Sequence, residues 1–381
     1  MEAVEMGLSS TITLKGRVSE MKNALKRKSF LFFSLAILWA AAMLGGCDST
    51  QTNDSGASGA VAETAAEVPA PAEEISFTLN ISYSGGLYEA LMRDIAAKAE
   101  ELSGGRIKGN IIASGTMGSE REVGEAVQLG TLDMAYLSDN VAETLIGGLS
   151  WAWLPFMIST YEEADKYYNT GWIREELWKK MAEAHLIGIA VCENGFRNYG
   201  NTVKAVTGQA EFRGQKVRVP EQPDLIKFYQ LCGALPVAIS GSEVITALEQ
   251  KTIDAVDNTI YNFHANGYID TLKYITVTNH QYTSNNIVVS PAFWNALSEE
   301  DRGIIRQAAE YACARYTATR RSEEEDVIKA CKASGYTFVE PDEKFQAELK
   351  MVARQIWAEF KVNYDPKIIS RIQEQFGHKM D

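Results

Sequence analysis

The chain has 381 residues, 46% of them hydrophobic, and a formal net charge of -13 at pH 7. This length supports one large or two medium domains with hydrophobic cores. The acidic balance, without a basic stripe interleaved with aromatic residues, argues against a nucleic-acid partner. The four histidines are scattered without the spacing of metal ligands, so the sequence predicts no metal and no other cofactor.

The N-terminal segment has the parts of an export signal. Basic residues follow Met21, an apolar run covers residues 30–44, and two glycines lead to Cys47. The run is shorter than the roughly 20 residues that span a membrane. A cysteine directly after Leu-Gly-Gly resembles the bacterial lipobox, in which the cysteine receives a lipid. We therefore expect residues 1–46 to be a leader that truly starts at Met21, and Cys47 to be the lipid attachment site. A soluble secreted protein is the alternative.

Residues 47–74 predict a flexible tether, because Ser, Thr, Ala, Glu and Pro dominate and large apolar side chains are nearly absent. A folded body is expected from about Ile75.

Of its four cysteines, Cys313 and Cys331 fall on one predicted helix about 27 Å apart, too far for a disulfide. Cys192 and Cys232 are expected to be buried thiols, although export permits a disulfide.

The body begins with an alternation of strands and helices. Strands are predicted at 77–81, 107–113 and 132–137, and helices at 87–102 and 120–129. This order is typical of an α/β layered fold, in which ligands bind at the carboxyl ends of the strands.

Two segments of the chain echo each other. Ala126-Val-Gln-Leu-Gly-Thr-Leu-Asp-Met-Ala and Ala247-Leu-Glu-Gln-Lys-Thr-Ile-Asp-Ala-Val both indicate a helix end, a tight turn and a short strand. Strand, loop and helix precede each of them, so we predict two similarly built α/β lobes that face each other across a cleft. Asp133 and Asp254 occupy equivalent turn positions, where a structural role is favoured over acid–base chemistry.

The second part of the body predicts further strands and a long helix. Strands are expected at 186–192, 217–219, 274–278 and 287–290, with a crossing between the lobes at Glu193–Asn201. No Gly or Pro occurs between Gly303 and Gly335, which predicts one helix of about 35 residues spanning both lobes. The first lobe would contain 75–194 and about 284–322, and the second about 195–283 and 323–381.

Arg197 and Arg218 are the strongest functional candidates. Each adjoins an apolar strand, where a guanidinium should be paired or held for a ligand. An acidic chain that binds an anion needs such fixed cations in a cleft. The alternative for each is a structural ion pair with Glu193 or Glu221. Motifs for nucleophilic, nucleotide-dependent or metal catalysis are missing from the sequence.

Several segments, in order along the chain, resemble the solute-binding proteins of tripartite ATP-independent periplasmic (TRAP) transporters. They are Asp165 with Tyr167–Tyr168, Glu193–Asn198, Lys216–Glu221, Gly233-Ala-Leu-Pro, Ser242-Glu-Val, Ile253-Asp-x-x-Asp-Asn, Asn279-His280 and Phe293-Trp294.

The resemblance implies a two-lobed periplasmic-binding-protein-like fold that closes on an organic acid. It also implies delivery of that acid to a small and a large membrane subunit driven by an ion gradient. Arg218 matches the arginine that pairs with the ligand carboxylate, Arg197 the supporting arginine, and Asn258 the asparagine after a second-lobe strand. Specificity contacts are expected at Glu221, Ser138, Gly241 and the Ser82–Gly86 loop, including Ser84.

The sequence departs from the family pattern at two places. Ala255-Val-Asp-Asn-Thr stands where Gly-Gln-Glu-Asn-Pro is common, and Gly241 stands where an aromatic residue is often found. The second departure predicts a larger or differently shaped pocket. Two other classes of function stay open at this point: a ligand-sensing lipoprotein for a membrane receptor, and an enzyme on a two-lobed scaffold.

Overall fold

The computed structural model describes residues 73–380 except 84 and 113. The expected leader, the lipid site Cys47 and nearly all of the tether lie outside these residues, as does Ser84. The described residues belong to one compact unit, 69–381. No helix within them is both long enough and apolar enough to cross a membrane.

One mixed sheet forms the centre of this unit. The strand order is β2-β1-β3-β8-β4-β7-β5-β6, and β9 pairs with β8. The strands are β1 (Ile75–Asn80), β2 (Ile107–Ile112), β3 (Met134–Ser138), β4 (Ile187–Asn201), β5 (Lys216–Val219), β6 (Leu235–Ala238), β7 (Ala255–Thr259), β8 (Tyr274–Val289) and β9 (Thr337–Val339).

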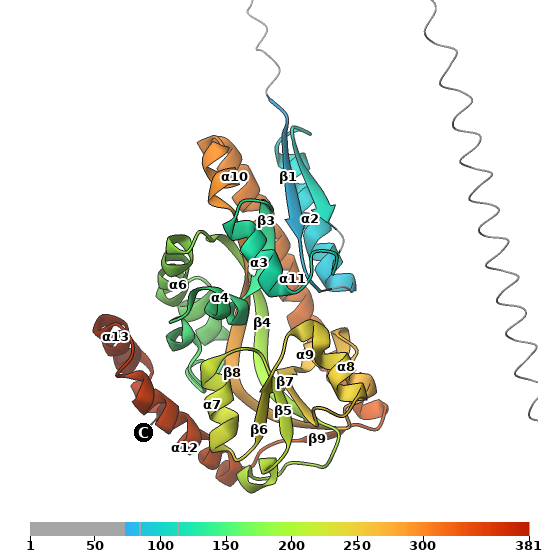
Figure 1. Cartoon of the computed structure of the whole chain (residues 1–381), viewed down its shortest axis with the longest axis vertical. Coiled ribbons are helices and arrows are strands. Elements are labelled where there is room, and N and C mark those ends of the chain that lie inside the picture. The colour runs from blue at the N-terminus through green and yellow to red at the C-terminus, as the bar shows by residue number, and fades with distance from the viewer. Residues whose placement is uncertain (1–72, 84, 113, 381) are drawn as a thin grey trace, which may run out of the picture. The chain divides into compact units, whose positions relative to one another are not determined.

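The sheet contains two sets of parallel strands. In the first set β1 pairs with β2 and β3, and in the second β5 pairs with β6 and β7. The antiparallel strands β4 and β8 lie between the sets and pair with each other. Figure 1 shows the first set in blue and teal and the second in yellow and green, joined by β4 and β8. The structure confirms the predicted two-lobed α/β fold; the lobe limits stay a prediction.

The two echoed segments form the same turn. The backbone N–H groups of Thr131 and Thr252 donate to the carbonyls of Ala126 and Ala247, each at 3.0 Å. Each following aspartate then binds a neighbouring strand: Asp133 Oδ2 accepts from the N–H of Thr78 at 2.7 Å, and Asp254 Oδ2 from the N–H of Lys216 at 2.9 Å. Both aspartates therefore join neighbouring strands, which agrees with the structural role that the sequence favoured for them.

Helices cover the sheet. They are α2 (Gly86–Leu102), α3 (Glu120–Gln128), α4 (Asp139–Ile146), α5 (Tyr161–Glu163), α6 (Trp172–Glu183), α7 (Pro223–Leu231), α8 (Val244–Glu249), α9 (Ile260–Ala265), α10 (Pro291–Ala296), α11 (Glu299–Ala333), α12 (Glu343–Phe360) and α13 (Pro366–Phe376).

The long helix α11 connects two hydrophobic cores. Its residues between Ile305 and Tyr316 pack with β1, β3 and α2, whereas Val327 and Cys331 pack with β7 and α9. Ser298 begins the helix by accepting a hydrogen bond from the N–H of Asp301 at 3.1 Å. The predicted helix of about 35 residues is confirmed, and its span explains how one element contacts both strand sets.

The strands predicted at 186–192, 274–278 and 287–290 are shorter than the strands β4 and β8 of the structure. Glu193–Asn201 continues β4, and the expected strands at 274–278 and 287–290 are two ends of β8. Their middle parts are polar yet buried, because the polar groups find partners across the sheet; Asn194 Nδ2, for example, donates to Thr283 Oγ1 at 2.9 Å. Periodicity of apolar residues does not reveal such strands.

The four cysteines of the described residues are buried and free. Cys313 and Cys331 both lie on α11, as predicted. Cys192 and Cys232 are buried thiols, which agrees with the expectation for them.

Candidate functional site

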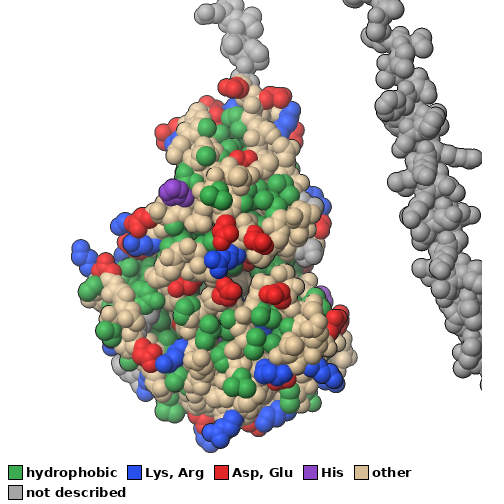
Figure 2. All heavy atoms as spheres, viewed as in Figure 1, with side chains coloured by type: hydrophobic (Ala, Val, Ile, Leu, Met, Phe, Trp, Pro, Cys, Tyr) green, Lys and Arg blue, Asp and Glu red, His purple; other side chains and the backbone are tan. Residues whose placement is uncertain are grey.

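A cavity of about 430 Å³ lies where the two strand sets meet. Its walls come from the loop after β1, the start of α3, the ends of β3, β5, β6 and β7, the middle of β4, and α9. Parallel strands bring their carboxyl ends to one edge, so residues distant in sequence converge here. On the face seen in Figure 2, acidic and basic side chains gather midway along the described unit. The volume is typical of small-molecule sites.

Six of the seven sequence-predicted ligand residues line this cavity: Arg197, Arg218, Asn258, Glu221, Ser138 and Gly241. The seventh, Ser84, lies outside the described residues. The structure thus brings the candidates together, and their contact with a ligand stays a prediction.

Arg218 is a buried cation that forms no salt bridge with an acidic side chain of the described residues, although the charges of Asp257 and Glu120 act on it from farther away. It is 5% exposed, and its Nε and Nη2 donate to the carbonyl of Ile239 at 3.0 and 2.9 Å. A guanidinium has five N–H donors, so part of it stays available toward the cavity. Burial lowers the pKa of Arg218, with a further contribution from the charge of Arg197. An anion in the cavity would offset the free-energy cost of burying the positive charge of Arg218.

Arg197 is paired, although not with either glutamate considered from the sequence. Its Nε and Nη2 both reach the Asp257 carboxylate, and Nη2 also donates to the Asp257 carbonyl at 2.9 Å. Tyr229 Oη donates to Asp257 at 2.8 Å, and His280 Nε2 lies 2.9 Å from it. Burial alone would raise the pKa of Asp257, but Arg197 and His280 lower it to about 2. Arg197 lines the cavity as part of this fixed network.

The two glutamates have partners other than Arg197 and Arg218. Glu193 accepts from Arg321 Nε at 3.0 Å and from Tyr282 Oη at 2.9 Å. Glu221 is about half exposed at the rim, where its carboxylate lies 3.9 Å from Arg121 Nη1. Because Arg121 lies in the first turn of α3 and Glu221 follows β5, this pair links the two strand sets across the cavity mouth.

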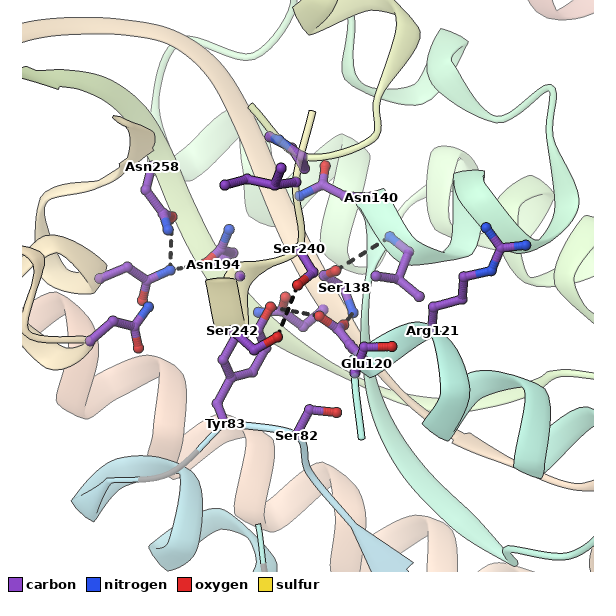
Figure 3. A pocket seen from close by; sticks show the side chains of 18 of the residues that line it. Ser82, Tyr83, Glu120, Arg121, Ser138, Asn140, Asn194, Ser240, Ser242 and Asn258 are labelled. Atoms are coloured by element: carbon purple, nitrogen blue, oxygen red, sulfur yellow. Dashed lines mark hydrogen bonds between the residues drawn. The ribbon is translucent and has the colours of Figure 1, made fainter. Parts of the chain in front are cut away.

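Glu120 is a buried carboxyl group in the cavity wall that the sequence analysis missed. It is 7% exposed at the start of α3; Ser138 N–H donates to its Oε1, and Tyr83 Oη donates to its Oε2 at 2.7 Å. Burial raises the pKa of Glu120 despite these bonds. Figure 3 shows Glu120, Ser138 and Tyr83 around the cavity. The available signal was a helix N-terminus that follows a strand and a Gly-rich loop.

Tyr83 occupies the space beside Gly241. A Cβ added to Gly241 would lie 3.0 Å from Cε1 and 3.1 Å from Oη of Tyr83. The ring also stacks on Tyr88, with centroids 5.3 Å apart. The Tyr83 ring, which comes from the first strand set, thus fills the volume next to Gly241. The absent side chain at position 241 therefore does not leave empty space in the pocket.

Asparagine side chains form much of the remaining wall. Asn262 Nδ2 donates to Asn194 Oδ1 at 2.9 Å and to Asn258 Oδ1 at 3.0 Å. Figure 3 labels Asn194 and Asn258. Asn140, Asn266 and Asn285 also line the cavity. Carboxamides both donate and accept hydrogen bonds, which suits them to bind hydroxyl groups.

Four large aromatic side chains that could stack on a bulky acid by their type lie outside the cavity wall: Trp151, Trp153, Tyr261 and Phe263. All four are buried in hydrophobic clusters, which supports core packing. A search of the described residues for three or more His, Cys, Asp or Glu side chains able to hold a metal ion finds none.

Comparison with known proteins defines the class of this chain. The family model described as bacterial extracellular solute-binding protein, family 7 (DctP) matches residues 84–363. A relative named sialic acid-binding periplasmic protein SiaP, from Vibrio cholerae, is 24% identical over 282 residues, covering 73% of this chain and 85% of the relative. A second, named solute-binding protein, from Verminephrobacter eiseniae, is 27% identical over 292 residues, covering 76% and 87%.

A solved structure shares the fold. The TRAP periplasmic solute-binding protein from Polaromonas sp. JS666, bound to D-erythronate, has a TM-score of 0.73 and 27% identity, covering 79% of this chain and 98% of that one. The chain therefore belongs to the family 7 extracellular solute-binding proteins. It is a solute receptor of the TRAP type, and its relatives are binding proteins of transporters, not enzymes.

Proposed function

We propose that the cavity binds a hydroxylated organic acid, with the carboxylate on Arg218. The observation that carries this proposal is a buried guanidinium that faces the cavity without an acidic partner among the described residues. Glu120 and the asparagines supply acceptors and donors for hydroxyl groups on the same ligand. The D-erythronate of the Polaromonas protein and the ligand in the name of the Vibrio protein are both acids with several hydroxyls.

Replacement of Arg218 tests the proposal. Arg218→Ala should weaken binding of D-erythronate or a related sugar acid by about 100-fold or more, since losing a buried charge partner costs about 3–5 kcal/mol. Arg121→Ala is the matched control, because it removes a cation that is 54% exposed at the rim, and should change affinity by no more than about fivefold. Isothermal titration calorimetry measures both. An unchanged dissociation constant for Arg218→Ala would refute the assignment.

We further infer that the chain delivers its ligand to a small and a large TRAP membrane subunit from the periplasmic side of the membrane. Family membership supports this step. Proteoliposomes containing both subunits should take up labelled acid under an ion gradient only when the receptor is added. Equal uptake without the receptor would contradict delivery.

The lipid anchor at Cys47 is a separate proposal, supported by the lipobox-like sequence. The native chain should then fractionate with membranes and the Cys47→Ser variant should not. Identical fractionation of the two would contradict anchoring.

A further inference from the structure

Arg320 is a third buried cation close to the site, after Arg197 and Arg218. It belongs to α11, is 4% exposed and does not line the cavity. Its Nη1 donates to Asn262 Oδ1 at 3.0 Å and to Tyr316 Oη at 3.1 Å. Its Nη2 donates to the Asn194 carbonyl at 2.7 Å and to Thr259 Oγ1 at 3.0 Å. No carboxylate of residues 73–380, as far as they are described, forms a salt bridge with it. Its contacts lead instead to two asparagines of the cavity wall.

The chemistry of Arg320 fixes the orientation of Asn262. A guanidinium only donates hydrogen bonds, so the Asn262 atom that faces it must be the oxygen. Tyr88 Oη adds a second donor to the same oxygen at 3.3 Å. The Asn262 amide nitrogen therefore points the other way and donates to Asn258 Oδ1 at 3.0 Å. A flipped Asn262 would place N–H groups against the guanidinium.

Asn258 is oriented in turn. Its Oδ1 accepts from Asn262 Nδ2 and also from the backbone N–H of Thr259 at 2.9 Å. Both of these N–H groups can only donate a hydrogen bond, so the side-chain atom of Asn258 that faces them must be its oxygen. Its Nδ2 is left without a partner among the described residues, on a side chain that lines the cavity (Figure 3).

The register of the sheet places this donor near Arg218. Arg218 pairs with Val256 in parallel β5 and β7, and Asn258 is two residues farther along β7. Side chains two residues apart share one face of a strand, so Arg218 and Asn258 lie on the same side of the sheet. A ligand whose carboxylate is bound by Arg218 would therefore share the cavity with Asn258 on that side of the sheet.

We propose that Arg320 is a positioning residue that, through Asn262, fixes Asn258 as a hydrogen-bond donor to an oxygen on the carbon next to the ligand carboxylate. The inference rests on the proposed binding of an acid by Arg218. It narrows the ligand to 2-hydroxy or 2-oxo acids, because an acid lacking that oxygen leaves the Asn258 donor unpaired in a buried site.

Two acids that differ only at this oxygen provide the test. D-erythronate carries a 2-hydroxyl group, and 3,4-dihydroxybutanoate is the same four-carbon acid without it. The native protein should prefer D-erythronate by about tenfold, the worth of one buried hydrogen bond. Asn258→Ala should lower this preference to about one.

Two further variants test the relay itself. Asn262→Asp keeps the size of the side chain and still accepts from Arg320, but it turns an acceptor toward Asn258 Oδ1 and so opposes the bond from the Thr259 N–H; the preference should fall toward one. Arg320→Met should also lower the preference, and Asn258→Ala should cause a smaller loss in the Arg320→Met background than in the native protein. A merely structural role for Arg320 would weaken both acids equally and leave their ratio unchanged. Asn262→Asp keeps the test decisive if Arg320→Met fails to fold, as judged by thermal unfolding.

The outcomes separate the two proposals. The role of Arg320 is overturned if the tenfold preference for D-erythronate persists in both Asn262→Asp and Arg320→Met. It is also overturned if the native protein binds the two acids with about equal affinity. Either result leaves acid binding by Arg218 intact. An Arg218→Ala variant that binds both acids like the native protein overturns the proposed function, and so does a native protein that binds neither acid.

Discussion

Arg197 and Arg218 have opposite environments, although their sequence contexts are alike. Arg197 is neutralised by Asp257 within a buried network that includes Tyr229 and His280. Arg218 has only a carbonyl partner among the described residues. The first arrangement stabilises the fold around the site, and the second leaves a cation for a ligand. The distinction depends on Asp257, which is 60 positions away from Arg197, so no local pattern predicts it.

The Arg197–Asp257 pair predicts a pH-dependent contribution to stability. The pKa of Asp257 is lowered from an ordinary 3.8 to about 2, so the stabilisation is present above pH 4 and is lost as the pH falls through 2. Asp257→Asn should reduce the free energy of unfolding by about 3 kcal/mol at pH 7, and the difference should narrow by about 1 kcal/mol at pH 3. Urea unfolding at the two pH values measures this.

A matched control is available on the surface. Asp165 pairs with Arg321 and is 52% exposed, so Asp165→Asn should cost less than about 1 kcal/mol at pH 7. Equal losses for the two variants, or an Asp257→Asn loss that is the same at pH 7 and pH 3, would contradict the buried-pair interpretation.

At the scale of elements, the loop after β1 and the segment after β6 share one end of the cavity. The Tyr83 ring fills the space beside Gly241, and Tyr268 Oη donates to the Gly241 carbonyl at 3.1 Å. Because the two segments come from different strand sets, their contact bounds this end of the cavity from both sides. A side chain at 241 and a ring at 83 compete for the same volume.

This competition predicts a compensating pair of substitutions. Gly241→Leu should weaken acid binding by about tenfold or more, because its side chain meets the Tyr83 ring in the cavity wall. Adding Tyr83→Ala to Gly241→Leu should restore affinity to that of Tyr83→Ala alone. Calorimetry with D-erythronate measures the cycle, and Gly303→Leu, where an added Cβ meets nothing within 4 Å, is the control.

A Gly241→Leu variant that binds as tightly as the native protein would contradict the predicted clash. So would a double variant no better than Gly241→Leu alone.

The sequence predicted elements well where local chemistry decides them. Helix α11 followed from the absence of Gly and Pro, and the repeated turns followed from matching Thr-x-Asp segments. It failed at β4 and β8, whose central residues are polar. There the strand is stabilised by long-range partners, such as the hydrogen bond between Asn194 and Thr283, which a single sequence does not display.

At the scale of the whole described unit, the candidate site is a product of topology. Two parallel strand sets point their carboxyl ends toward each other, and α11 packs against both cores. Most of the predicted ligand residues lie at or just after those strand ends, and strand ends can be predicted from the order of elements along the chain. Glu120 and Arg320 were missed because their roles arise only from contacts with distant residues, Ser138 and Asn262. Tyr83 belongs to the predicted Ser82–Gly86 loop, but its contact with Gly241 was not predicted.

The central claim is that Arg218 binds the carboxylate of an acid enclosed between the two strand sets. A crystal structure of the protein with D-erythronate tests it most directly. We predict the carboxylate in the cavity, with an oxygen about 2.7–2.9 Å from an Arg218 guanidinium nitrogen. A complex in which the carboxylate contacts other residues, and Arg218 keeps only its bonds to Ile239, would contradict the claim.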